Sequence, residues 1–207
     1  MDVSHAVPAF DLHTAGFLVW AGTHAFPAGT VHLAVVDPGV GTSRRALALR
    51  VGDSYFVGPD NGLFSMVIRE CREGAIQAVE LARPAASSRT FEGRDVFAPA
   101  AARLAAGEPM AAIGAAAVGP KILPDPGPRV LWVDRWGNLI TSLKPPLRGL
   151  KIRGHEVSAS APTFGDAPRD QLFHYVGSMG LIEVAVREGR AASLLDVEAG
   201  ELVIPLS

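Results

Sequence analysis

The chain has 207 residues, of which 48% are hydrophobic and 19% charged, with a formal net charge of −2 and one cysteine. This composition suits a globular protein with a full core, and it excludes a nucleic-acid-binding surface, an internal disulfide and a cysteine-cluster metal site. No apolar stretch approaches the roughly 18 residues of a membrane span and nothing resembles a signal peptide, so we expect a soluble cytoplasmic protein.

The first half of the chain alternates helical and strand patterns, separated by glycine-bearing corners. An apolar run at 31–36 predicts a buried strand, and Gly52-Asp53 is a turn dipeptide typical of a hairpin. We therefore expect an α/β domain over residues 1–120, built on a mostly parallel sheet. Its predicted elements are helices at 11–25, 63–69 and 97–106, and strands at 31–36, 46–51, 54–57 and 75–81.

Asp37 directly follows the predicted strand at 31–36, and a Pro-Gly turn, a second glycine and Arg44 come next. In open α/β sheets, ligands bind beyond the carboxyl ends of the strands. An acid and a cation placed around a glycine turn at such an end are candidates for catalysis. The plain alternative is a β-turn that carries a surface aspartate.

The composition changes at 119–128, where four prolines fall within nine residues. Such a stretch is typical of a linker or domain boundary. Short alternating segments separated by turn residues follow it, and they predict a smaller all-β domain, a barrel or sandwich, over residues 128–207. The predicted strands lie at 130–133, 139–143, 149–152, 180–186 and 201–206.

Several other polar features have plain structural interpretations. Asp60-Asn61 is typical of a turn, and Arg94-Asp95 of a helix start with a local ion pair. His5 and His32 lack the spacing of metal ligands, so we expect no metal. Trp132 and Trp136 are interpreted as core residues. The high apolar content indicates a buried subunit interface.

Six motifs nevertheless occur in order and carry a family resemblance: Asp2-Val3-Ser4-His5, Val36-Asp37-Pro38-Gly39-Val40-Gly41, Gly58-Pro59-Asp60-Asn61-Gly62, Thr90-Phe91-x-Gly93-Arg94-Asp95-Val96-Phe97, Asp134-x-x-Gly137-Asn138-Leu139-Ile140-Thr141 and Gly177-Ser178-x-Gly180-Leu181-x-Glu183. Together they closely resemble the S-adenosylmethionine hydroxide adenosyltransferases, relatives of fluorinases and chlorinases. The resemblance implies hydrolysis of S-adenosylmethionine to adenosine and methionine, with no cofactor. It also implies a homotrimer whose active sites lie between subunits.

The resemblance also implies roles for individual residues. Asp37 and Arg44 match two members of a catalytic Asp-Arg-His set, and Glu92 stands at the histidine position. Substrate-binding positions are also expected from the resemblance. Phe10 would pack near the nucleoside, and Asp134 and Ser178 would contact the methionine amino and carboxylate groups. Asn138 would lie on the adenine side, and Phe91 and Gly93 are the substrate-binding positions on either side of Glu92.

Two departures from the family pattern carry expectations of their own. Members usually begin earlier, with a strand and an Asp-Phe-Gly-x-x-Asp motif that grips the ribose, so we expect either a late-assigned gene start or a truncated protein. For the environment of Glu92 we consider three alternatives. It lies near Asp37 and raises one carboxylate's pKa, it pairs with Arg44 and competes with Asp37, or it is a solvated residue on a mobile loop.

The proposed chemistry suits these side chains. A sulfonium leaves as a neutral thioether, so the enzyme needs an aimed, desolvated water rather than a general acid. Asp37 can accept the proton of this water while Arg44 orients the carboxylate. The runner-up is a non-catalytic nucleoside-binding trimer. A halogenase is disfavoured, because halide-binding relatives lose the carboxylate at the Asp37 position and carry serine at the Gly93 position.

Overall fold

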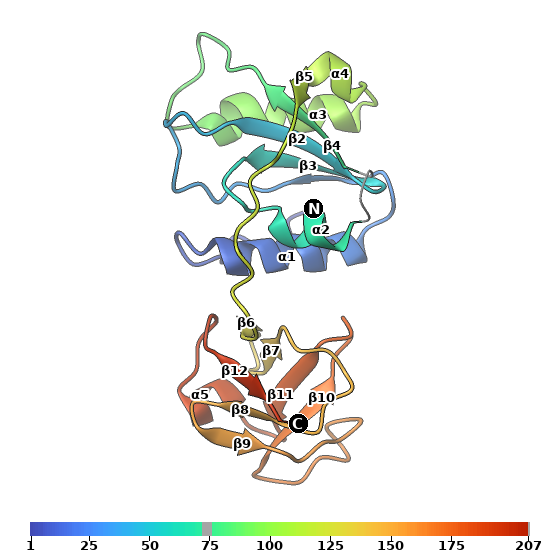
Figure 1. The fold of residues 1–207 in the computed structure, drawn as a ribbon, viewed down its shortest axis with the longest axis vertical. Coiled ribbons are helices and arrows are strands. Elements are labelled where there is room, and N and C mark those ends of the chain that lie inside the picture. Colours follow the sequence, from blue (N-terminus) through green and yellow to red (C-terminus); the bar gives the residue numbers. More distant parts are fainter. Residues whose placement is uncertain (72–75, 207) are drawn as a thin grey trace. The chain divides into compact units, whose positions relative to one another are not determined.

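The computed structural model describes residues 1–71 and 76–206. It divides into two compact units, Met1–Pro124 and Asp125–Ser207, which are drawn in Figure 1 and are described separately below. The division falls inside the proline-rich stretch at 119–128.

Unit 1 is built on a five-stranded sheet with the order β1-β3-β2-β4-β5. Its β1–β3 pair is parallel, and the three other described pairs are antiparallel, so the prediction of a mostly parallel sheet is wrong. For β2 and β3 the physical reason is the two-residue turn at Gly52-Asp53, because so short a connection can join only antiparallel strands. The strands are β1 (Val31–Leu33), β2 (Ala46–Val51), β3 (Ser54–Pro59), β4 (Ile76–Leu81) and β5 (Gly114–Ala117).

Helices cover both faces of this sheet, with α1 and α2 on one side and α3 and α4 on the other (Figure 1). Strand β2 fits this arrangement, because Ala46 and Ala48 alternate with Leu47 and Leu49 and all four are buried. Among the described residues, no helix is long and apolar enough to cross a membrane. The helices are α1 (Leu12–Ala25), α2 (Ser65–Glu70), α3 (Ala98–Ala105) and α4 (Met110–Ile113), with a π-helical turn η1 (Gly93–Phe97) leading into α3.

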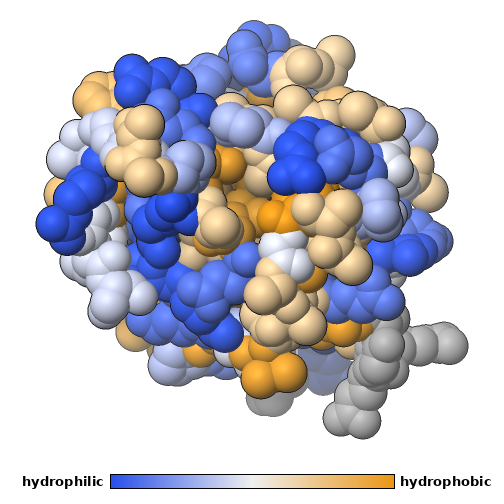
Figure 2. Space-filling view, turned by 90° about the horizontal axis from the view of Figure 1, so that it is seen from above, coloured by the Kyte–Doolittle hydropathy of each residue, from blue (hydrophilic) through white to orange (hydrophobic). Residues whose placement is uncertain are grey.

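The strand predicted at 31–36 is shorter and more exposed than expected. Only Val31–Leu33 pairs as β1, at the edge of the described sheet, and Leu33 and Val35 are 47% and 44% exposed. The prediction of a buried strand is therefore wrong. The predicted strand at 75–81 is seen from Ile76, since Ala75 lies outside the described residues. Figure 2 shows one face of the molecule, on which hydrophilic and apolar side chains are mixed.

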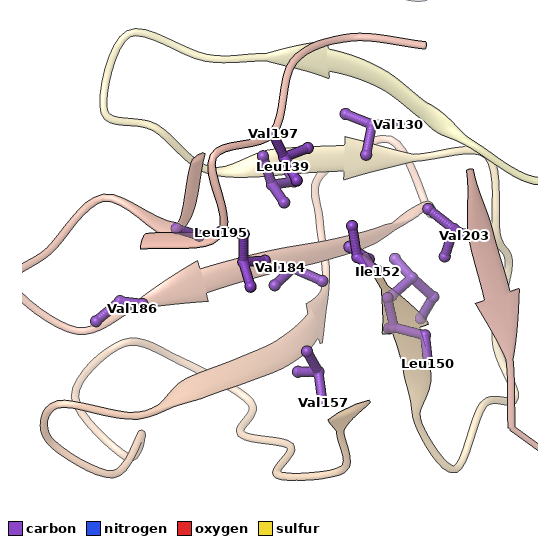
Figure 3. Packing of buried hydrophobic residues seen from close by; sticks show 12 residues of the cluster. Val130, Leu139, Leu150, Ile152, Val157, Val184, Val186, Leu195, Val197 and Val203 are labelled. Atoms are coloured by element: carbon purple, nitrogen blue, oxygen red, sulfur yellow. The ribbon is translucent and has the colours of Figure 1, made fainter. Parts of the chain in front are cut away.

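Unit 2 is rich in short strands, as its alternating pattern predicts. One sheet has the order β10-β11-β7-β6 and a second the order β12-β8-β9, and the described pairs within both are antiparallel. Valine, leucine and isoleucine side chains from both sheets and from α5 form one core (Figure 3). The elements are β6 (Val130–Val133), β7 (Leu139–Thr141), β8 (Leu150–Ile152), β9 (His155–Val157), β10 (Leu172–Val176), β11 (Ile182–Val186), α5 (Ala191–Leu195) and β12 (Val203–Pro205).

Candidate active site

A buried ion pair lies in the loop between β1 and β2. The Arg44 Nε donates to Asp37 Oδ1 at 3.0 Å, and Arg44 Nη2 donates to Asp37 Oδ2, so the contact is bidentate. The backbone amide of Gly39 also donates to Asp37 Oδ1, at 3.1 Å. The side chains of Asp37 and Arg44 are only 6% and 9% exposed. The loop thus fixes the direction of the Asp37 carboxylate.

Two further contacts stabilise the Arg44 guanidinium. Its carbon lies 5.2 Å from the centre of the Phe97 ring, within cation–π range. Its Nη2 also donates to Glu92 Oε2. Burial lowers the pKa of Arg44, but the hydrogen bonds and negative charges of Asp37 and Glu92 outweigh this and raise the pKa above its ordinary value. Arg44 is therefore a permanent cation between two carboxylates.

Glu92 immediately precedes η1, and its side chain is 3% exposed. It accepts hydrogen bonds from Arg44 and from Arg83 Nε. Burial raises the pKa of Glu92, but the two arginines outweigh this, so the pKa lies below its ordinary value. The structure thus favours the alternative in which Glu92 pairs with Arg44. The pKa of Glu92 itself is lowered rather than raised, and the alternative of a solvated residue is wrong because the side chain is buried.

Phe10 lies with Asp37 around one hollow of unit 1. The hollow has a volume of about 350 Å³ and is lined by residues of 4–10 and by Val35, Asp37 and Pro38. Phe10 is 76% exposed and has a φ of 68°, a left-handed backbone conformation that is uncommon for an aromatic residue. The exposed Phe10 ring could therefore pack against an uncharged ring of a ligand bound beside the Asp37 carboxylate.

The two neighbours of Glu92 differ in their surroundings. Phe91 is 59% exposed, and the Arg94 guanidinium lies 5.1 Å from the centre of its ring. Phe91 does not line the hollow that Phe10 and Asp37 share. Gly93 faces Val35, whose methyl carbons would lie 3.6 Å and 3.8 Å from an added Cβ. Sterically, Gly93 could therefore be replaced by a small side chain.

The other three predicted substrate-binding residues, Asp134, Asn138 and Ser178, line one pocket of unit 2, of about 910 Å³. Asp134 Oδ1 accepts from the backbone amides of Trp136 at 2.8 Å and Asn138 at 2.9 Å, and its Oδ2 accepts from Asn138 Nδ2 at 2.9 Å. Asp134 therefore closes the turn between β6 and β7. Asn138 is buried, whereas Ser178 is exposed.

Trp136 corrects one sequence-based interpretation. It is 60% exposed and lines the unit 2 pocket, so the prediction of a core residue is wrong. The turn closed by Asp134 directs it outward, and the Arg135 guanidinium lies 4.3 Å from its ring centre. Trp132 is half-buried and also lines the pocket.

Glu183 and Gly177 also line this pocket, and neither was predicted as a site residue. Glu183 is buried, and the Tyr175 hydroxyl donates to its Oε2. Burial and the nearby charge of Asp134 raise the pKa of Glu183, although the Tyr175 hydrogen bond opposes them. Gly177 leaves room for this carboxylate, because an added Cβ would lie 1.9 Å from Glu183 Oε1. Gly177 and Glu183 both belong to the last of the six sequence motifs, so that motif could have indicated them as site residues.

Arg83 was also missed, since it lies in an irregular loop between two motifs. Within residues 1–71 and 76–206, no cluster of three or more histidine, cysteine, aspartate or glutamate side chains is arranged to hold a metal ion.

Comparisons with known proteins agree with the motifs. A model of the S-adenosylmethionine hydroxide adenosyltransferase N-terminal domain matches residues 1–114, and one of the C-terminal domain matches residues 128–204. The (R)-S-adenosyl-L-methionine hydrolase of Salinispora arenicola is 43% identical over 97% of this chain and 84% of its own length. The hydrolase of the same name from Thermus thermophilus is 39% identical, over 97% of this chain and 85% of its own length.

A solved structure is similar over the whole chain. The crystal structure of an uncharacterized conserved protein from Thermotoga maritima superposes with a TM-score of 0.92 at 31% identity, covering 100% of this chain and 88% of that one. With both domain models matched in order, the chain belongs to the S-adenosylmethionine hydroxide adenosyltransferase family.

Proposed function

We propose that this chain hydrolyses (R)-S-adenosylmethionine to adenosine and methionine, with Asp37 as the general base. Relatives of 39–43% identity that span nearly the whole chain are named as hydrolases of this compound. The observation that carries the proposal is the buried, bidentate Asp37–Arg44 pair beside an open hollow.

The proposed reaction is a displacement at the ribose C5′. Water attacks C5′ and forms the new C–O bond, the C5′–S bond breaks, and its electron pair moves to the sulfonium, which leaves as the neutral thioether of methionine. Asp37 accepts the proton that the water loses. No redox step or external group is required, so we propose that the reaction needs no cofactor.

Asp37 retains the capacity for this role. A carboxylate offers about four acceptor sites, and the described contacts from Gly39 and Arg44 account for three of them. A water can therefore donate to Asp37 while Arg44 holds the carboxylate in position. The guanidinium also stabilises the hydroxide-like oxygen that develops as the proton moves.

In unit 2 we propose that the pocket holds the amino-acid and adenine ends of the substrate. Asp134 and Ser178 would receive the ammonium and carboxylate groups of methionine, and Asn138 the adenine edge. Trp136 would present an aromatic face to the base, since it is exposed within the same pocket. Phe10, Phe91 and Gly93 would border the nucleoside on the unit 1 side.

We further propose a homotrimer, in which the unit 1 set of one copy and the unit 2 set of another make up each site. Exposed apolar side chains in unit 1, namely Phe10, Leu33 and Val35, support a surface that a partner copy covers. A cytoplasmic location stays a prediction, which cell fractionation would test.

Incubation with separately prepared (R) and (S) epimers, followed by chromatography, tests the proposed function. We expect adenosine and methionine in equal amounts from the (R) epimer. Chloride or fluoride added to the assay should give no 5′-halogenated adenosine, because Asp37 would repel a halide. Binding of the (R) epimer without any product would instead favour the non-catalytic binding trimer.

A further inference from the structure

Glu92 is held by two arginines that come from different loops. Arg44 lies between β1 and β2, whereas Arg83 follows β4, and they donate to different oxygens of the Glu92 carboxylate. The Glu92 side chain is 3% exposed, and that of Arg83 is 34% exposed. Arg83 is therefore the partner of Glu92 on the solvent side, and Arg44 is its partner on the side of Asp37.

The charges of these four side chains alternate along a continuous chain of contacts. Asp37 pairs with Arg44, Arg44 with Glu92, and Glu92 with Arg83. Two carboxylates and two guanidiniums balance each other. Without Arg83, two buried carboxylates would share the single guanidinium of Arg44, and a buried carboxylate without full pairing is unfavourable. Arg83 therefore supplies the second cation for the two carboxylates.

A second contact ties Arg83 to the same loop. Its Nη2 donates to the backbone carbonyl of Arg44 at 2.7 Å. Two other charged residues follow Glu92 in the sequence, Arg94 and Asp95, and they form an ion pair with each other. Asp95 also accepts from the backbone amide of Ser88.

We propose that Arg83 is a positioning residue for the reaction: by neutralising Glu92 and holding the backbone of Arg44, it keeps the Arg44 guanidinium on Asp37. This inference rests on the proposed function of the site. It assigns to Arg83 a role that acts through Glu92 and Arg44, with no contact to the substrate.

The test compares Arg83→Gln, Arg83→Lys, Glu92→Gln and the double variant Arg83→Gln/Glu92→Gln. Arg50→Gln is the matched control, because Arg50 is an arginine of the same unit near the opposite end of β2, paired with Asp53. For each protein, kcat and KM for S-adenosylmethionine are measured against pH. A second measurement, which needs no turnover, follows hydrogen exchange of the Arg44 Nε–H by NMR, since this group donates to Asp37.

Arg83→Gln should lower kcat about tenfold with little change in KM, because a mispositioned base slows the chemical step more than binding. The acid limb of its kcat profile should move to higher pH, and exchange of the Arg44 Nε–H should accelerate. Arg83→Lys should keep most of the activity. The double variant should recover both kcat and slow exchange, since the competing carboxylate is gone.

The inference would be overturned if Arg83→Gln kept the wild-type dependence of kcat on pH and the wild-type exchange rate of the Arg44 Nε–H. A double variant no better than Arg83→Gln would also overturn it, because that result assigns Arg83 a purely structural role. If the unchanged protein releases no adenosine, the proposed function fails, and the exchange data alone decide whether Arg83 positions Arg44.

Discussion

The Arg44 guanidinium donates to both carboxylate oxygens of Asp37, and each of these side chains is less than a tenth exposed. A bidentate contact fixes the plane as well as the position of a carboxylate. In the proposed reaction this direction matters, because the water must lie in line with the breaking C5′–S bond.

Replacing the base while preserving its shape should abolish turnover. Asp37→Asn can still accept a hydrogen bond from Arg44 but cannot accept a proton, so we expect kcat to fall at least about 100-fold. Binding of S-adenosylmethionine, measured by calorimetry, should change little. Asp53→Asn is the control, because Asp53 is 81% exposed. Wild-type turnover in Asp37→Asn would rule out the role of Asp37 as base.

Removing the shared cation should destabilise unit 1. Arg44→Gln leaves Asp37 without a charged partner and Glu92 with Arg83 alone, and breaking a buried pair costs about 3 kcal/mol. The two carboxylates can relieve this by taking up protons, so the loss should be largest at neutral pH and should shrink on acidification. Urea denaturation at pH 7 and pH 5 measures both effects. An equal loss at the two pH values would contradict the electrostatic cause.

The lowered pKa of Glu92 carries a pH dependence of its own. Its ion pairs stabilise the folded state above the pKa that Glu92 has when unfolded, and this contribution is lost as the pH falls through the lower, folded value. Glu92→Gln should remove the contribution. The stability difference between the two proteins should therefore narrow in acid. A difference that stays constant from neutral to acidic pH would show that Glu92 is not held as an anion.

Glu92→His should restore the family's usual residue and maintain or raise turnover. A neutral imidazole does not compete with Asp37 for Arg44, and burial beside two guanidiniums disfavours its protonation. The acid limb of the activity profile should therefore extend to lower pH. A pH profile identical to that of the unchanged protein would indicate that Glu92 has no influence on the base.

Glycine is required at 177 because the Glu183 side chain lies close to it, and not because of the backbone conformation. Gly177→Ala would place a Cβ 1.9 Å from Glu183 Oε1, and overpacking of this kind costs about 1–3 kcal/mol. Displacement of Glu183 from the pocket should also raise KM for S-adenosylmethionine. Gly165→Ala is the control, since its Cβ would meet only Thr163 Oγ1, at 3.6 Å. Equal stability of the two variants would contradict this account.

Much of this site could be predicted from the sequence because it is local. Asp37 and Arg44 lie seven residues apart around one glycine turn, so a single motif brings them together. The strand Ala46–Val51 was predicted with its observed bounds, since an apolar segment precedes a clear hairpin turn.

Other features depend on packing that no local pattern records. The direction of β4 relative to β2 and the short edge strand β1 follow from the assembled sheet. Arg83 reaches Glu92 only because β4 and the loop after it lead the chain back past Arg44. Its residue type alone gave no signal.

The assembly can be tested in solution. If each site is made by two copies, light scattering should give the mass of a trimer at assay concentrations, and dilution should lower specific activity as the trimer dissociates. A stable monomer with full activity would defeat this arrangement.

In the proposed reaction, water activated by Asp37 attacks the ribose C5′. Hydrolysis of (R)-S-adenosylmethionine in water enriched in oxygen-18, followed by mass spectrometry of the adenosine, tests it most directly. We predict one heavy oxygen in the 5′-hydroxyl group for each adenosine formed, and none in the methionine. Adenosine without heavy oxygen, or free adenine in place of adenosine, would rule out attack of water at C5′.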